Sequence, residues 1–364
     1  MGYRGATVRR WLIAGLLGLT AAAPLPALGP AVDAAAAHGL EGVVLAGDAD
    51  SAIFDRAVGM ANRGTGRAHR MDDAWPIAPV TKKIVAVLVM QEVDAGRLQL
   101  DETLADALPA FHGQAAARIT LRQLLQHTSR LPNPSATATA TATAQDKDGV
   151  EAFDRTPAGP GAAIQFCTGT GAADPASAKF DYNNCDYLVL GAILERSSGL
   201  PLARLITDPL HSVFTLPGGA QGFAAPQIGY VDGAKPEPLV RLATFGAAVA
   251  QIGKPLDLLA LDRALLAGKL LSAQARATLW EGNPKLGYEA LGQWVFPAKP
   301  AGCAAPMQLI ECEGDIAGIQ VRNYIAPATG RILIVFANRA DVDFGQLWQG
   351  TGLGLNVASA ESSA

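Results

Sequence analysis

The sequence predicts an α/β protein of the α+β kind, with one antiparallel sheet built from both chain ends and flanked by helices. Two observations lead to this expectation. Strand patterns bounded by turn residues occur near both ends, at 42–59 and 318–338. Between them lies a largely helical middle, and its segment 84–93 is apolar on nearly every side, which places that helix inside a domain.

Composition indicates a soluble globular protein. The chain has 364 residues, a soft prior for about two domains, and 49% of them are apolar, enough for a large core. The 29 basic and 33 acidic residues give a formal charge of −4. This near balance favours neither nucleic acid nor an anionic membrane as a partner, and we expect a monomer.

Residues 1–37 are expected to be a signal peptide rather than part of the fold. Three arginines form a positive start, residues 11–23 are apolar, and small residues with suitable cleavage sites follow at 27–37. The apolar run is shorter than the roughly 18 residues of a membrane span. We therefore expect export to the periplasm or the medium, with no membrane anchor after signal removal.

The mature chain is expected to form one domain, 38–356, followed by a disordered tail. Ser135 to Ala144 alternates Ala and Thr and is expected to be a flexible loop. The expected parts are sheet segments 38–78 and 285–345, a helical part 79–284, the low-complexity loop 135–144 and the tail 357–364.

Individual elements follow from local patterns. Turn residues 48–51 and 327–330 predict two hairpins, the second between strands 318–326 and 332–338. Thr120 is expected to cap one short helix and Asp101 to begin another. Further strands are predicted at 288–296 and 307–311, and further helices at 187–197 and 256–271.

Four cysteines in an exported chain favour disulfides over metal ligation. The simplest of the three connectivities pairs Cys167 with Cys185 and Cys303 with Cys312. No Cys-x-x-Cys pair is present and the five histidines are scattered, so we expect no metal site and no cofactor.

The run 77–82 opens the central helix and reads Ile-Ala-Pro-Val-Thr-Lys. Pro79 suits the first helical position, where its missing N–H has no intrahelical partner. Lys82, three residues later, lies on the same face. A lysine in the first turn of a buried helix requires either a catalytic role or buried polar partners.

This run resembles the Ser-x-x-Lys motif of the serine β-lactamase and penicillin-binding-protein superfamily, with proline in the serine's place. In the class C-related and esterase-like branch the text resembles Ile-Ala-Ser-Val-Thr-Lys. Four further motifs follow in order between 42 and 339. They are Leu-Leu-Gln-His-Thr-Ser-Arg-Leu at 124–131, Tyr-Asn-Asn at 182–184, the Tyr-to-Trp run 288–294, and Glu-Cys-Glu-Gly at 311–314. The resemblance implies a β-lactamase/transpeptidase-like fold.

The resemblance also implies roles for individual residues. In active relatives the serine forms an acyl-enzyme after activation by the lysine, and the tyrosine relays a proton. Lys82 and Tyr182 thereby become a remnant general-base pair. Asn184, Cys312 and Gly314 correspond to binding positions, with Cys312 where the family carries a cation. His127 is expected to be structural, and the expected ligands are a peptidoglycan-type peptide or a β-lactam-like small molecule.

Pro79 separates two functional hypotheses. It lacks the hydroxyl with which the family's serine attacks, and it lacks the backbone N–H that this serine contributes to the oxyanion hole. The first hypothesis is an exported, catalytically degenerate member that binds a cell-wall peptide or a partner in the old cleft. The alternative is an active serine-type hydrolase (a β-lactamase, carboxypeptidase or esterase) with a rearranged nucleophile. Thr81 lies roughly 100° around the helix from the pocket face, and Lys82 could simply be a buried remnant.

Overall fold

The computed structural model describes most of the chain. The described residues are 28–111, 116–132, 164, 167, 179–207, 228–231, 235–237, 245–299, 305–316, 318–350 and 353. The expected flexible loop 135–144, the tail 357–364, Cys303 and residues 1–27 of the expected signal peptide lie outside them. Among the described helices, none is long and apolar enough to span a membrane.

A six-stranded antiparallel sheet joins the two ends of the chain, as expected. Its strand order is β2-β1-β12-β11-β10-β9, so the strand nearest the N-terminus pairs directly with the last one. The strands are β1 Gly42–Gly47, β2 Ala52–Val58, β9 Trp294–Ala298, β10 Met307–Ile316, β11 Ile319–Ala326 and β12 Arg331–Ala337. Both hairpins form at the predicted turns.

Three short two-stranded sheets accompany the main one. Their strands are β3 Met60–Asn62 with β4 Arg67–Ala68, β5 Trp75–Pro76 with β8 Ile252–Gly253, and β6 Gly229–Val231 with β7 Lys235–Glu237. The β5–β8 pair is the important one for the site, because it holds the chain that leads into the central helix.

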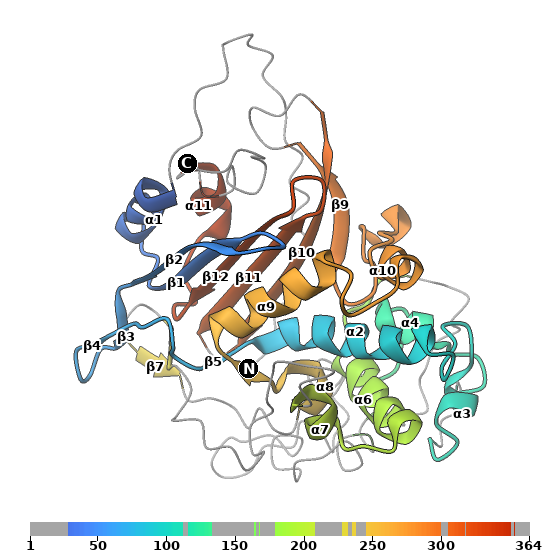
Figure 1. Ribbon diagram of the computed structural model, residues 1–364. Coiled ribbons are helices and arrows are strands. Elements are labelled where there is room, and N and C mark those ends of the chain that lie inside the picture. Colours follow the sequence, from blue (N-terminus) through green and yellow to red (C-terminus); the bar gives the residue numbers. More distant parts are fainter. Residues whose placement is uncertain are drawn as a thin grey trace, which may run out of the picture.

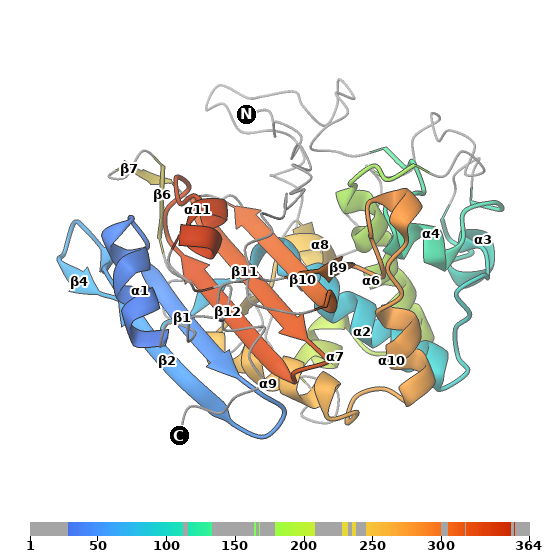
Figure 2. The same cartoon turned by 90° about the horizontal axis from the view of Figure 1, so that it is seen from above.

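Helices cover both faces of the sheet (Figures 1 and 2). Two of them, α1 Leu28–Ala37 and α11 Phe344–Gly350, pack on one face over a small apolar cluster. The others belong to the larger core on the opposite face or surround it. They are η1 Ala78–Val80, α2 Thr81–Asp94, α3 Leu104–Ala107, α4 Leu121–Leu125, α6 Asn184–Ser198, α7 Leu202–Thr207, α8 Gly246–Val249, α9 Pro255–Leu266, α10 Ala273–Leu279 and η5 Pro284–Leu286.

The helix α2 runs through the larger core, as its all-round apolar sequence predicts. Every residue from Thr81 to Met90 is buried. Pro79 lies in the 3₁₀ turn η1 that leads into this helix. Proline is tolerated there because the N–H that it lacks would have no intrahelical acceptor. The predicted helices capped by Thr120 and over 187–197 also form, as α4 and α6.

Four expectations are corrected by the structure. Residues 28–37, assigned to the signal peptide, form α1, whose Ala31, Val32 and Ala35 are buried against the sheet. Because those small residues pack closely on an apolar sheet face, the folded domain includes this segment. The short helix after residue 101 begins later, where the Thr103 side chain accepts the Asp106 N–H.

The other two corrections concern the segment 288–312. The sequence predicts a strand over 288–296, but β9 begins only at Trp294 and ends at Ala298. Tyr288 and Gly292 take φ values of 73° and 72°, which interrupt the extended conformation before it. The predicted bond between Cys303 and Cys312 is wrong for Cys312, which is a buried free thiol. The predicted Cys167–Cys185 disulfide is present.

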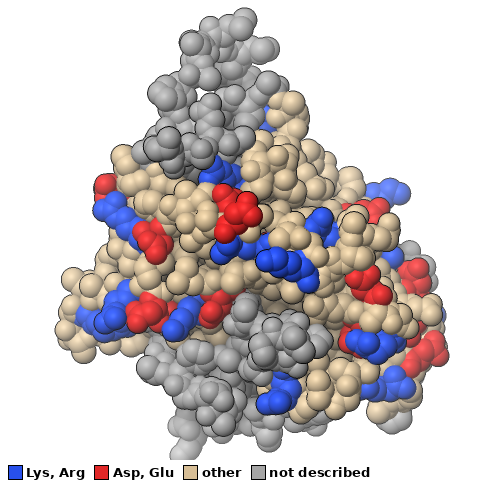
Figure 3. Space-filling model, in the orientation of Figure 1, with Lys and Arg blue, Asp and Glu red and all other residues tan. Residues whose placement is uncertain are grey.

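Positive and negative side chains alternate over the face of the molecule shown in Figure 3. Ion pairs among the described residues include Arg56 with Asp33, Arg63 with Glu41 and Arg67 with Asp73. This arrangement matches the nearly balanced formal charge of the chain.

Candidate active site

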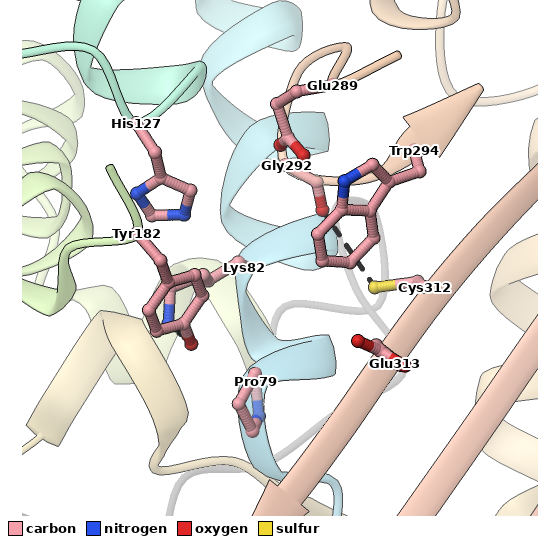
Figure 4. Close-up of a pocket in the computed structure, with 9 residues that line it drawn as sticks. All are labelled: Pro79, Lys82, His127, Tyr182, Glu289, Gly292, Trp294, Cys312 and Glu313. Carbon is pink, nitrogen blue, oxygen red and sulfur yellow. Dashed lines mark hydrogen bonds between the residues drawn. The ribbon is translucent and has the colours of Figure 1, made fainter. Parts of the chain in front are cut away.

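A small pocket lies where η1, the start of α2, the loop before α6, the turn before β9 and strand β10 meet. Figure 4 shows its lining, with Tyr182 and Lys82 on one side, Trp294 and Cys312 on the other and Pro79 at the base. The lining residues are Pro79, Lys82, His127, Tyr182, Glu289, Gly292, Trp294, Cys312 and Glu313. The cavity measures about 20 Å³, which is room for roughly one water molecule.

Pro79 is held in place by close backbone packing. The Ile77 N–H donates to the Gln251 carbonyl, and Ala78 has a φ of 55°, unusual for a residue with a Cβ. A Cβ on Gly314 would lie 3.0 Å from both the Ile77 oxygen and the Pro79 nitrogen. Gly314 is therefore required where β10 crosses η1, and this contact brings the third motif to the first turn of the helix.

Lys82 is the centre of the polar network in this pocket. Its side chain is buried, and Nζ donates to Tyr182 Oη at 2.7 Å, Asn184 Oδ1 at 2.9 Å and the Ala248 carbonyl at 3.0 Å. Burial lowers the pKa of Lys82 from 10.5 to about 7. At neutral pH a large share of the amine is therefore unprotonated, as a general base requires.

Tyr182 and Asn184 reach Lys82 because of the way α6 begins. Asn183 caps this helix, and its side chain accepts the Cys185 N–H at 2.8 Å. This cap holds its two neighbours, Tyr182 and Asn184, at the pocket. The Cys167–Cys185 disulfide is in the first turn of the same helix and restrains it further. Tyr182 is 36% exposed, so it forms the edge of the pocket toward solvent.

Cys312 lies where the resemblance expects a cation. Its thiol is buried and lies 3.8 Å from the Gly292 carbonyl. Burial raises the pKa of Cys312 to about 12, so the group stays a neutral thiol at physiological pH. The structure therefore places no positive charge at this position, and the thiolate needed for nucleophilic attack is scarce.

Three other polar residues near the pocket serve the fold. His127 Nδ1 accepts the Asn183 N–H at 3.2 Å and lies 3.0 Å from Asp186 Oδ2. Burial lowers the pKa of His127 well below its usual value. The buried Ser129 hydroxyl donates to Asp186, and Thr81 Oγ1 accepts the Gln251 N–H at 3.3 Å. Neither hydroxyl lines the pocket.

Glu289 and Trp294 are pocket residues that sequence reasoning passed over. Both belong to the run 288–294, which the motif comparison treated as a strand. Burial raises the pKa of Glu289 well above its usual value, against the opposing effect of Lys82. A carboxyl in an otherwise apolar, glycine-containing run was the available signal, because Glu is rarely fully buried without a partner.

The family model described as Beta-lactamase matches residues 30–352, nearly the whole described chain. The chain belongs to the beta-lactamase family. This serine hydrolase family accounts for the order of the five motifs, and the match includes most of helix α1. Among the described residues, no group of three or more His, Cys, Asp or Glu could hold a metal ion.

Two curated proteins are similar in sequence to this beta-lactamase-family chain. Penicillin-binding protein 4 of Amycolatopsis lactamdurans is 32% identical over 212 residues, which are 55% of this chain and 52% of that protein. Esterase EstB of Burkholderia gladioli is 32% identical over 207 residues, 51% of this chain and 49% of the esterase. The matched part thus spans about half the length of each relative.

Solved structures share the fold of the family at lower identity. FmtA from Staphylococcus aureus has a TM-score of 0.71 at 16% identity, covering 90% of this chain and 88% of FmtA. A D-stereospecific amidohydrolase from Streptomyces has a TM-score of 0.71 at 23% identity, covering 89% of this chain and 97% of the amidohydrolase. These similarities establish the fold alone.

Proposed function

We propose that this protein is a catalytically degenerate member of the family that binds a ligand in the old active-site cleft without forming an acyl-enzyme. The observation that supports this most is Pro79 at the base of the pocket, one turn before Lys82. Proline has no hydroxyl to attack a carbonyl and no N–H for an oxyanion. Loss of one oxyanion-hole donor alone costs about 10²–10³ in rate.

The other nucleophiles near the pocket are poorly suited to replace a serine. The Cys312 thiol is kept protonated by burial. Ser129 is buried and bonded to Asp186, and Thr81 faces Gln251 rather than the pocket. A hydroxyl that is buried and already hydrogen-bonded would have to give up that bond to attack a substrate.

Tyr182 supports the alternative, a hydrolase with a rearranged nucleophile. Its hydroxyl is 2.7 Å from Lys82 Nζ, and the residue is 36% exposed. A phenol next to an amine with a pKa of about 7 has a base within reach. Without a donor at Pro79, however, the oxyanion formed in such an attack would lack one half of its stabilisation.

The cellular setting remains a proposal as well. The charged and apolar pattern before residue 27 supports export to the periplasm or the medium, and the Cys167–Cys185 disulfide suits an oxidising compartment. One relative is named a penicillin-binding protein, which supports a cell-wall peptide or a β-lactam-like small molecule as the ligand. We propose separately that the protein is a monomer. No nucleic acid partner is proposed.

Intact-protein mass spectrometry tests the proposed function. The purified protein is incubated with a penicillin and, separately, with a fluorophosphonate, and its mass is measured. We expect no mass increase, whereas the Pro79→Ser variant should gain one penicilloyl group from the penicillin and one phosphonyl group, with loss of fluoride, from the fluorophosphonate. An adduct on the wild-type protein that peptide mapping places on Tyr182 would replace the proposal with the rearranged hydrolase.

A further inference from the structure

Glu289 is a buried carboxyl that lines the pocket and has one oxygen without a hydrogen-bond partner. The residue is 1% exposed, and its Oε2 atom has no hydrogen-bond partner. Its position is fixed from both sides, because its carbonyl accepts the Asn283 N–H and its N–H donates to the Leu286 carbonyl. Leaving such an acceptor unsatisfied destabilises the protein, and a ligand carrying a donor would remove that cost.

Among the described residues, none donates a hydrogen bond to this acceptor. Lys82 directs its Nζ to Tyr182, Asn184 and the Ala248 carbonyl, three acceptors within 3.0 Å. The Cys312 thiol faces the Gly292 carbonyl. The other carboxyl of the lining, Glu313, lies 3.6 Å from Arg322 and adds a second acidic group at the pocket.

Aromatic rings complete the surroundings of the carboxyl. Tyr182, Trp294 and His127 line the same cavity as Glu289 (Figure 4). Lys82 Nζ already lies 4.6 Å from the centre of the Tyr182 ring, so the geometry of this pocket accommodates a cation against an aromatic face. Cations bind such faces within about 6 Å of the ring centre.

The size of the cavity restricts what can enter. About 20 Å³ holds a group of roughly the size of one water molecule. A carboxylate needs more room than this, and it has no N–H or O–H to donate to the unpartnered Glu289 oxygen. An ammonium group on an unbranched stem is close to water in size, and its stem can leave the pocket past the partly exposed Tyr182.

We propose that the cleft selects a primary ammonium group, which donates to Glu289 and lies against the aromatic rings, so that its ligand is an amine and not a carboxylate. The inference rests on the proposed function, because it concerns the ligand of the same non-acylating cleft. It reverses the charge preference expected from a cation at the Cys312 position, and it fits the family's cell-wall peptides only where they carry a free amine.

Isothermal titration calorimetry with three matched probes tests the inference on the wild-type protein. n-Butylammonium, n-butanol and butyrate have similar stems and differ in head group. We expect n-butylammonium to bind at least tenfold more tightly than n-butanol, and butyrate to show no binding. Equal affinities, or tighter binding of butyrate, would overturn the proposal without any variant being needed.

Variants locate the binding. Glu289→Gln should weaken n-butylammonium binding at least tenfold and leave n-butanol binding nearly unchanged. Glu281→Gln, an exposed carboxyl in the same connection between α10 and β9, is the matched control and should bind as the wild type does. Retained ammonium affinity in a folded Glu289→Gln protein would overturn the assignment. Acyl adducts in the mass experiment would instead refute the proposed function, so the two failures are distinguishable.

Discussion

Lys82 and Pro79 are one helical turn apart and place different demands on the fold. Pro79 suits a helix start and needs nothing from its neighbours. Lys82 is an amine taken out of water and kept in place by three hydrogen bonds. Burying an amine disfavours its charged form, so Lys82 costs stability at low pH.

The stability of the protein should therefore depend on the protonation of Lys82. Its pKa is about 7 in the folded state against 10.5 as the ordinary value. Between these pH values the unfolded chain binds more protons than the folded one, so the free energy of unfolding rises with pH. The cost is complete below pH 7 and disappears above pH 10.5.

Comparison with Lys82→Met isolates this contribution. From pH 7 to pH 9, the free energy of unfolding of the wild type should rise by roughly 2 kcal/mol relative to that of Lys82→Met, since one pKa unit corresponds to about 1.4 kcal/mol. Urea unfolding at both pH values provides the measurement. Parallel pH profiles for the two proteins would show that Lys82 keeps its ordinary pKa when folded.

Three elements are joined by a second buried lysine. Lys83 of α2 forms an ion pair with Asp262 of α9 and donates to Asn323 Oδ1 of β11 at 2.6 Å. Asn323 Nδ2 in turn donates to Asp262 Oδ2 at 2.5 Å. This closed network sets the distance between the central helix, the helix that covers the sheet (Figure 1) and the sheet itself. It thereby supports the position of Lys82 next in the chain.

Replacing one member of the network should lower the free energy of unfolding far more than replacing two. Asp262→Leu leaves the Lys83 charge buried without its partner, which costs about 3–5 kcal/mol. The double variant Lys83→Met/Asp262→Leu should recover most of that loss. Denaturant unfolding measures both, with Asp72→Ala in an exposed ion pair as the control that leaves the midpoint nearly unchanged. A double variant as unstable as the single one would contradict this account.

At the scale of the whole molecule, local patterns predicted the sheet and the central helices well. The hairpin β11–β12 and the strand β1 follow from turn residues and apolar runs, which act over a few residues. Helix α1 was missed because small apolar residues after a charged start also describe a cleavage region. The run 288–293 was misassigned because its turn depends on Tyr288 and Gly292 taking left-handed conformations.

Motif spacing predicts some residues of the site, and tertiary packing determines the others. Lys82, Tyr182 and Asn184 came from motif spacing, and the structure brings all three together. The sequence marks Glu289 only as a carboxyl in an apolar run. Its place in the pocket and the size of the cavity depend on how a turn packs against α2. A Cβ on Gly292 would lie 2.5 Å from the Tyr187 hydroxyl, and only this tight crossing brings the turn's carboxyl close to Lys82. The free state of Cys312 likewise depends on tertiary position.

Turnover of a chromogenic cephalosporin and of a p-nitrophenyl ester by wild type and Pro79→Ser tests the central claim most directly. Serine restores the hydroxyl and the N–H at a position where it is well tolerated at a helix start, and Lys82 remains one turn away. The Lys82→Met version of Pro79→Ser serves as the control without a base. We predict negligible turnover by the wild type, measurable turnover by Pro79→Ser and its loss in the double variant. Wild-type turnover comparable to that of Pro79→Ser would contradict the account.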